Sequence, residues 1–252
     1  MRLGEHHLAS VGRDIPDPGP QLLPGFRPAT DADYESLVDR LIEETPTNGF
    51  WVFAYGSLIW NPDFDFIERR VAVAPGWHRK FCLGWDFRFR GCREAPGLML
   101  ALDRGGSCRG VAFRLAPGAL RENLHRLVRR EMSMVPSAFP ARWILVRTAH
   151  GPLKALTFAM NRRSGRYVAG LSDEAVADVL ASACGFRGSM AEYLFATVSK
   201  LEELGIHDRH LWKLQELVAE RIERLPDFAP APAGASTDTG AARVTSSIGS
   251  RS

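Results

Sequence analysis

Glu131 combines a chemically capable side chain with an unusual place in the sequence pattern. It lies on the apolar stripe of a predicted helix at 119–131, where Leu120, Leu124 and Leu127 precede it at intervals of four, three and four residues. Burial raises the pKa of a carboxyl group, and the carbonyl end of a helix disfavours negative charge. Both effects favour Glu131 as a proton-accepting base. A structural ion pair at the end of the helix would give the same pattern.

Two arginines beside this glutamate bear on its charge. Arg129 and Arg130 can stabilise the anion, but helical geometry turns them roughly 200° and 100° away from Glu131. We therefore expect their influence on its pKa to be partial.

The second feature is the segment WVFAYGSLIW at 51–60, in which an apolar strand leads directly into Gly56, Ser57 and Leu58. Glycine permits a sharp turn and a close approach of a ligand to the main chain. Successive amides in such a turn can bind a carboxylate or a developing oxyanion, with the Ser57 hydroxyl as a further donor. An ordinary strand end would have the same sequence.

The elements that must position these residues alternate along the middle of the chain. The pattern predicts strands at 51–55, 71–74, 98–102, 110–115, 143–148 and 154–160. The last two are separated by a short turn and are expected to form an antiparallel hairpin. Helices are predicted at 119–131, 173–183, 190–204 and 210–225. This order indicates an α+β fold with a mixed sheet or small barrel and packed helices.

The two ends of the chain differ from the middle. Residues 1–29 contain a cluster of proline, aspartate and glycine, which predicts an extended or flexible arm. Thr30 and Asp33 form a capping-box-like helix start. A single domain is expected at 30–226, with its core at 51–225, and the small, polar, proline-bearing tail at 227–252 is expected to be disordered.

Composition limits the classes of function. Lysine and arginine exceed aspartate and glutamate by only three and are scattered, which favours no nucleic acid partner. The four cysteines form no CxxC pair and no His/Cys cluster has zinc-ligand spacing, so neither a metal nor a cofactor is expected. No signal peptide is visible and no run of about 18 apolar residues occurs. We expect a cytoplasmic protein that does not span a membrane.

An ordered set of motifs resembles the ChaC family of γ-glutamylcyclotransferases over about 51–225. In chain order the motifs are FAYGSLIWNPDF, PGWHRKF, Arg90-Gly91, RREM at 129–132 and AEYLF at 191–195. The resemblance implies a small mixed β-barrel with flanking helices and cleavage of glutathione to 5-oxoproline and cysteinylglycine. In that reaction the α-amine of the substrate attacks its own γ-amide carbonyl, and no metal is required.

The resemblance also implies roles for residues. It assigns the proton acceptor to Glu131, and the loop that holds the γ-glutamyl group to Tyr55, Gly56, Ser57 and Leu58. The flanking residues Ala54 and Ile59 are also expected to bind substrate. Two further substrate contacts are predicted. Tyr193 can donate its hydroxyl to the oxyanion, or it can be an aromatic residue of the core. Arg90 can bind the glycine carboxylate of glutathione, or it can be a solvated loop arginine.

The sequence departs from the family pattern at two places, and two alternative functions are considered. Ala54 stands where many relatives have glycine, and Met132-Ser133-Met134 replaces a glycine-rich stretch of the animal members. One alternative is a cyclotransferase for other γ-glutamyl amino acids or amines, which shares the chemistry. The other is a non-catalytic binding or regulatory protein on the same fold. The oligomeric state is not predicted.

Overall fold

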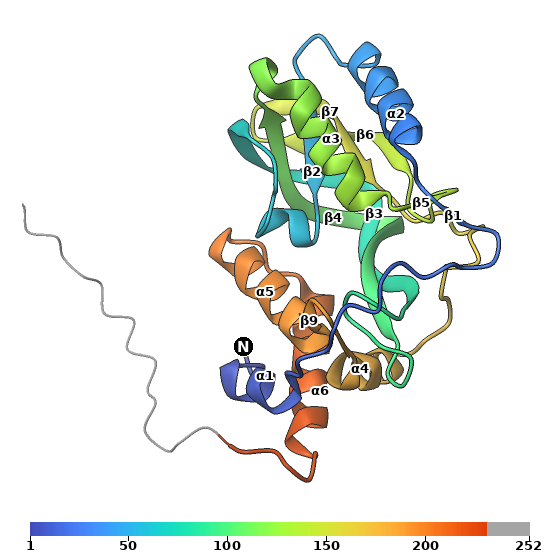
Figure 1. The fold of residues 1–252 in the computed structure, drawn as a ribbon. Helices are drawn as coiled ribbons and strands as arrows, with labels where there is room; N and C mark the ends of the chain where they lie inside the picture. Colours follow the sequence, from blue (N-terminus) through green and yellow to red (C-terminus); the bar gives the residue numbers. More distant parts are fainter. Residues whose placement is uncertain (231–252) are drawn as a thin grey trace, which may run out of the picture.

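Five strands close into a barrel in the order β2, β4, β3, β6, β7. The computed structural model describes residues 1–230, and Figure 1 shows the barrel above a group of helices. The barrel strands are β2 (Trp51–Ala54), β3 (Phe66–Asp86), β4 (Gly97–Leu115), β6 (Ala141–Thr148) and β7 (Gly151–Phe158). The β2–β7 pair is parallel and the other pairs are antiparallel, so the barrel is mixed, as expected.

Strand β2 is buried on both faces, which explains its continuous apolar sequence. Val52 and Ala54 belong to the main core between the barrel and the helices. Trp51 and Phe53 face a second cluster formed by the side chains inside the barrel. The turn that follows Ala54 therefore starts from a strand that is packed on both faces.

Strands β3 and β4 are longer than the sequence predicted. They pair over most of their 21 and 19 residues and extend from the barrel toward the C-terminal helices (Figure 1). The predicted strands at 98–102 and 110–115 are both parts of β4, because a register shift between Pro75 and Trp77 of β3 lets the pairing continue past Gly105 and Gly106. The loop at 87–96 joins the two strands at their helical end.

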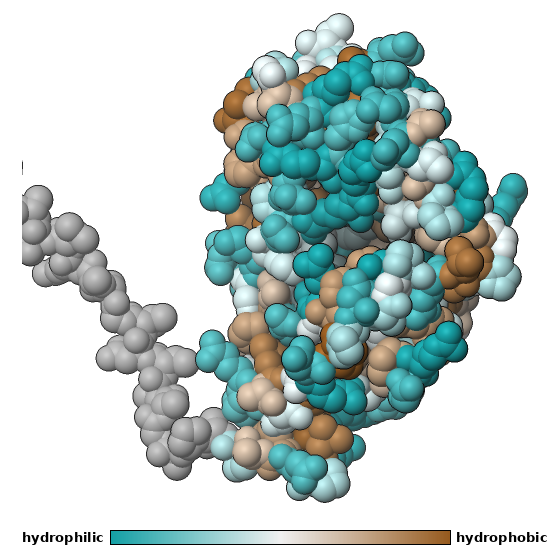
Figure 2. All heavy atoms as spheres, viewed as in Figure 1, coloured by the Kyte–Doolittle hydropathy of each residue, from teal (hydrophilic) through white to brown (hydrophobic). Residues whose placement is uncertain are grey.

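The predicted helices are all present. They are α2 (Asp31–Glu43), α3 (Leu120–Glu131), α4 (Asp173–Ser182), α5 (Met190–Glu203) and α6 (Arg209–Glu223). The capping box of Thr30 and Asp33 is formed as predicted. Helices α2 and α3 cover the barrel with mainly hydrophilic side chains outward (Figure 2). Within residues 1–230 no helix is long and apolar enough to cross a membrane.

The N-terminal segment contains more structure than an extended arm. Residues 5–11 form α1 (Glu5–Val11), and Leu3, His7 and Val11 are buried. The amides of Arg2 and Leu3 donate to Gln215 Oε1 at 2.9 and 2.8 Å, which fixes this segment to α6. The chain then crosses to β1 (Arg27–Pro28), which pairs with β5 (Met134–Val135) just after α3. Short strands β8 (Cys184–Gly185) and β9 (Gly188–Ser189) precede α5. The predicted tail at 227–252 lies outside the described residues from 231 onward.

Candidate active site

A cavity of about 570 Å³ opens between the barrel, the turn after β2, the end of α3 and the start of α5. The molecular surface is hollowed where the barrel meets the helices (Figure 2). Seven of the nine predicted site residues line the cavity: Tyr55, Gly56, Ser57, Leu58, Arg90, Glu131 and Tyr193. The other two, Ala54 and Ile59, do not line it and are buried in the main core.

The turn after β2 packs tightly against α5. Gly56 has φ −134° and ψ −130°, and a Cβ there would lie 3.0 Å from Tyr193 Oη. The 3₁₀ turn η1 (Ser57–Ile59) follows, and its first internal bond runs from the Ile59 amide to the Gly56 carbonyl at 2.9 Å. The preceding amides, those of Ser57 and Leu58, are at the start of this turn beside the cavity. The role of these amides as donors stays a prediction.

Glu131 is the last residue of α3, and its side chain faces the cavity with 16% of its surface exposed. Burial raises its pKa above the ordinary glutamate value. The charge of Arg130 and a hydrogen bond from its guanidinium oppose this effect in part. Arg130 Nε lies 3.1 Å from Glu131 Oε1, and Arg130 Nη2 donates to Ser57 Oγ at 2.9 Å. Arg129 instead pairs with Asp31 at 2.8 Å. Arg130 therefore joins the carboxylate to the turn after β2.

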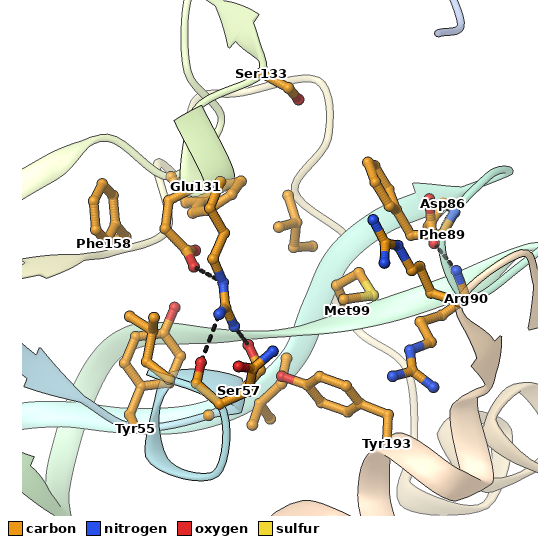
Figure 3. Close-up of a pocket in the computed structure, with 18 of the residues that line it drawn as sticks. Tyr55, Ser57, Asp86, Phe89, Arg90, Met99, Glu131, Ser133, Phe158 and Tyr193 are labelled. Carbon is orange, nitrogen blue, oxygen red and sulfur yellow. Dashed lines mark hydrogen bonds and ion pairs between the residues drawn. The ribbon is translucent and has the colours of Figure 1, made fainter. Parts of the chain in front are cut away.

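Two tyrosine hydroxyls share this part of the cavity. Burial, followed by the negative charge of Glu131, raises the pKa of Tyr55 well above its ordinary value. The same two causes raise the pKa of Tyr193 to about 12, although hydrogen bonds from Ser57 oppose them. Both phenols therefore stay protonated at neutral pH and can donate. In Figure 3 Tyr55, Ser57 and Glu131 lie together and Tyr193 approaches from α5. We call Tyr55, Gly56, Ser57, Arg130 and Glu131 the Glu131 end of the cavity.

The opposite part of the cavity, beyond Met99 in Figure 3, is organised by a buried aspartate. Asp86 accepts hydrogen bonds from the amides of Arg88, Phe89 and Arg90 at 3.2, 3.1 and 2.6 Å. A Cβ at Gly91 would lie 2.1 Å from the Gly97 nitrogen, so glycine is required where the two sides of the loop meet. We call residues 84–90, together with Arg166, the Asp86 end.

Arg90 lines the cavity, but its charge is already paired. Its Nη1 donates to Glu192 Oε2 at 2.7 Å and to the Ser189 carbonyl at 3.2 Å. Arg166, which the sequence did not indicate, lies at the same end and donates from Nε to the Gly84 carbonyl at 3.1 Å. Gly84 and Arg166 are 82 residues apart in the sequence, and no local sequence pattern connects them.

Comparison with known proteins gives one consistent family. A family model described as ChaC-like protein matches residues 50–221. A glutathione-specific γ-glutamylcyclotransferase of Escherichia coli K12 is 36% identical over 179 residues, covering 70% of this chain and 76% of that one. The human glutathione-specific γ-glutamylcyclotransferase 1 is 30% identical over 194 residues, covering 71% and 82%. The crystal structure of a yeast cyclotransferase specific to glutathione superposes with a TM-score of 0.62 at 20% identity, covering 68% and 96%.

Proposed function

The chain belongs to the ChaC-like family, and we propose that it is a γ-glutamylcyclotransferase that cleaves glutathione to 5-oxoproline and cysteinylglycine. The relatives named for this activity support the substrate, and the yeast enzyme supports the fold. A cytoplasmic location stays a prediction of the sequence. The observation that carries the proposed mechanism is the position of Glu131, a largely buried carboxylate that faces the cavity next to the donor turn.

The dimensions and charges of the cavity suit a small anionic peptide. A volume of about 570 Å³ falls within the range of about 300–1,000 Å³ typical of small-molecule sites. Five arginines and three carboxylates contribute to its walls. Glutathione carries two carboxylates and one ammonium group, so the excess of positive charge matches the charge of the substrate.

The reaction needs one group that first accepts a proton and later donates one. In the proposed mechanism, the Glu131 carboxylate takes a proton from the substrate α-ammonium, and the free amine attacks the γ-carbonyl carbon. A new C–N bond closes the five-membered ring, and the ring nitrogen releases its second proton to solvent. The amide C–N bond then breaks, and Glu131 returns its proton to the departing cysteinyl nitrogen. A raised pKa suits both steps, because the group must bind and release a proton near neutral pH.

The remaining groups hold the substrate and stabilise the oxyanion. Nucleophile and electrophile belong to one molecule, so the site must fold the γ-glutamyl chain into a ring-closing conformation. We place this group against the amides of Ser57 and Leu58 and the hydroxyls of Tyr55 and Tyr193, all on residues that line the cavity. Neutral phenols and fixed amides are suitable donors for a developing oxyanion.

The test compares the parent protein with Glu131→Gln in reduced glutathione, with 5-oxoproline and cysteinylglycine measured together by mass spectrometry. We expect equimolar products from the parent and a loss of about 10²- to 10⁴-fold in the variant, which is the usual contribution of a general base. Glu216→Gln is the matched control, because Glu216 is exposed on α6. Its rate should equal that of the parent.

Each departure from this result has a separate meaning. If Glu131→Gln keeps the parent rate, Glu131 is not the base. If the parent cyclises other γ-glutamyl amino acids or amines but not glutathione, the mechanism holds and the substrate assignment is wrong. If the parent binds glutathione and turns over no γ-glutamyl compound, the protein is a binding protein.

A further inference from the structure

The five arginines that line the cavity differ in how their charges are balanced. Three have a carboxylate partner: Arg90 with Glu192 at 2.7 Å, Arg129 with Asp31 at 2.8 Å, and Arg130 with Glu131 at 3.1 Å. For Arg166 and Arg187, no carboxylate oxygen of residues 1–230 lies within 4.0 Å of the guanidinium. The cavity therefore has two cations available for an anionic ligand.

Of these two, Arg166 is the one built into the cavity wall. Its carbonyl accepts from the Gly84 amide at 3.0 Å, and its Nε donates to the Gly84 carbonyl at 3.1 Å. The adjacent Tyr167 forms a β-bridge with Leu83. Arg187 is instead exposed, with its guanidinium over the Phe186 ring at 4.9 Å. Arg166 thus lines the cavity with its backbone and its Nε fixed to Gly84.

The two terminal nitrogens of Arg166 have no acceptor among the residues that the structure describes. Burial lowers the pKa of Arg166, and the charge of Asp86 opposes this effect only in part. Asp86 is not a direct partner, since no oxygen of its carboxylate lies within 4.0 Å of the Arg166 guanidinium; these oxygens accept the amides of residues 88–90. A half-buried guanidinium without an anion is an unfavourable arrangement that a bound carboxylate would correct.

We propose that Arg166 binds the glycine carboxylate of glutathione and so selects the tripeptide over shorter γ-glutamyl compounds. This inference rests on the proposed function. A γ-glutamyl group held at the Glu131 end directs its cysteinylglycine portion past Met99 to the Asp86 end (Figure 3). The carboxylate of the glycine then lies where Arg166 offers two parallel N–H donors. Arg90, which the sequence favoured for this role, is already paired with Glu192.

The test measures kcat and KM of the parent and of Arg166→Gln for three substrates: glutathione, its glycine ethyl ester, and γ-glutamylcysteine. The ester keeps the tripeptide but removes the negative charge, and the dipeptide removes the glycine. We expect Arg166→Gln to raise KM for glutathione about 10- to 100-fold, the effect of losing a charged hydrogen-bonded pair, with kcat retained. KM for the ester and the dipeptide should be unchanged. Arg163→Gln, an exposed arginine in the same loop, is the matched control and should behave as the parent.

Several results would overturn the inference. Equal losses of kcat/KM for glutathione and its ester in Arg166→Gln would indicate a purely structural role. An unchanged KM for glutathione would show that Arg166 does not contact the carboxylate. The same increase in Arg187→Gln and not in Arg166→Gln would assign the carboxylate to the other arginine.

One comparison uses the parent protein alone, so it tests the inference even if Arg166→Gln does not fold. The parent itself should have a KM for the ester that is higher than its KM for glutathione by about 10- to 100-fold. Equal values would sink the inference. If the parent turns over no γ-glutamyl compound, the proposed function fails, and calorimetry decides the inference separately: glutathione should still bind more tightly than its ester.

Discussion

The two ends of the cavity differ in how their charges are arranged. At the Glu131 end, the carboxylate, Arg130 and Ser57 are bonded to one another, so the charged groups are in place before a ligand enters. At the Asp86 end, Asp86 is bonded to its own loop while Arg166 has no anionic partner among the described residues. The Glu131 end is therefore a preorganised reaction centre. At the Asp86 end, an anionic group of the substrate would supply the missing partner of Arg166. Changes at the first end should affect kcat, and changes at the second should affect KM.

After the loss expected for Glu131→Gln, the largest effect at the Glu131 end is expected from Gly56→Ala. The added Cβ would lie 3.0 Å from Tyr193 Oη and 3.5 Å from Leu100 Cδ2, so the turn or the tyrosine must move. A displacement of about 1 Å near the reacting atoms can cost about 100-fold in rate. We expect kcat for glutathione to fall by about this factor. Steady-state kinetics on protein shown by circular dichroism to be folded would measure it.

Gly118→Ala is the control for this substitution. A Cβ at Gly118 meets no atom within 4 Å, so the same chemical change should leave kcat as in the parent. If Gly56→Ala alters KM alone, the turn only binds substrate, and the contrast between the two ends does not hold.

A smaller effect is expected from Asp86→Ala at the opposite end. The substitution removes an acceptor from three amides and leaves them without partners in a half-buried loop, at a cost of about 1–3 kcal/mol for an unsatisfied group. The loop that carries Arg90 should loosen, so KM for glutathione should rise while kcat stays near the parent value. Thermal denaturation and steady-state kinetics would measure the two effects.

Asp86→Asn should give an intermediate result. Its amide oxygen can still accept from Arg88 and Phe89, while its NH₂ group faces the Arg90 amide. A fall in kcat as large as that of Gly56→Ala would place Asp86 in the reaction centre and remove the distinction between the ends.

This contrast also explains which parts of the molecule the sequence predicted. The Glu131 end consists of short continuous segments, and each has a local signal. The apolar period of 119–131 predicted α3, and the apolar run at 51–55 with the following glycine predicted β2 and its turn. The β6–β7 hairpin was predicted in the same way, from its intervening turn.

The Asp86 end depends on contacts between distant segments, which leave no local pattern. The pairing of Gly84 with Arg166 is one example. Strand β3 is another, because its length follows from pairing with β4 around a bulge and not from its own alternation. The N-terminal segment is a third: its composition predicted an arm, but burial of Leu3 and His7 against α6 makes α1 part of the structure.

Arg130 contacts Glu131 although the two residues are neighbours in the sequence. The helical angle between Arg130 and Glu131 describes Cα directions, whereas the long arginine side chain curves back and brings Nε to 3.1 Å from the carboxylate. The prediction that the influence of the arginines is partial agrees with the raised pKa of Glu131. It is Arg130 alone that exerts it, since Arg129 turns to Asp31.

The smallest expected effect is a shift in the pH dependence of kcat/KM, which follows from the contact between Arg130 and Glu131. The proposed base must be ionised, so kcat/KM should rise with pH through the pKa of Glu131, which burial holds above the ordinary glutamate value. Arg130 lowers that pKa by its charge and its hydrogen bond. Arg130→Gln removes both effects, so the pKa should increase and the acid limb of the profile should move to higher pH.

Arg129→Gln provides the matched control. It removes the same positive charge from the preceding residue, whose side chain pairs with Asp31 and not with Glu131. Its acid limb should coincide with that of the parent. A limb that moves equally in both variants would indicate a general effect of net charge on substrate binding. A limb that moves to lower pH in Arg130→Gln would exclude Glu131 as the titrating group, since loss of a neighbouring cation can only make a carboxylate harder to ionise.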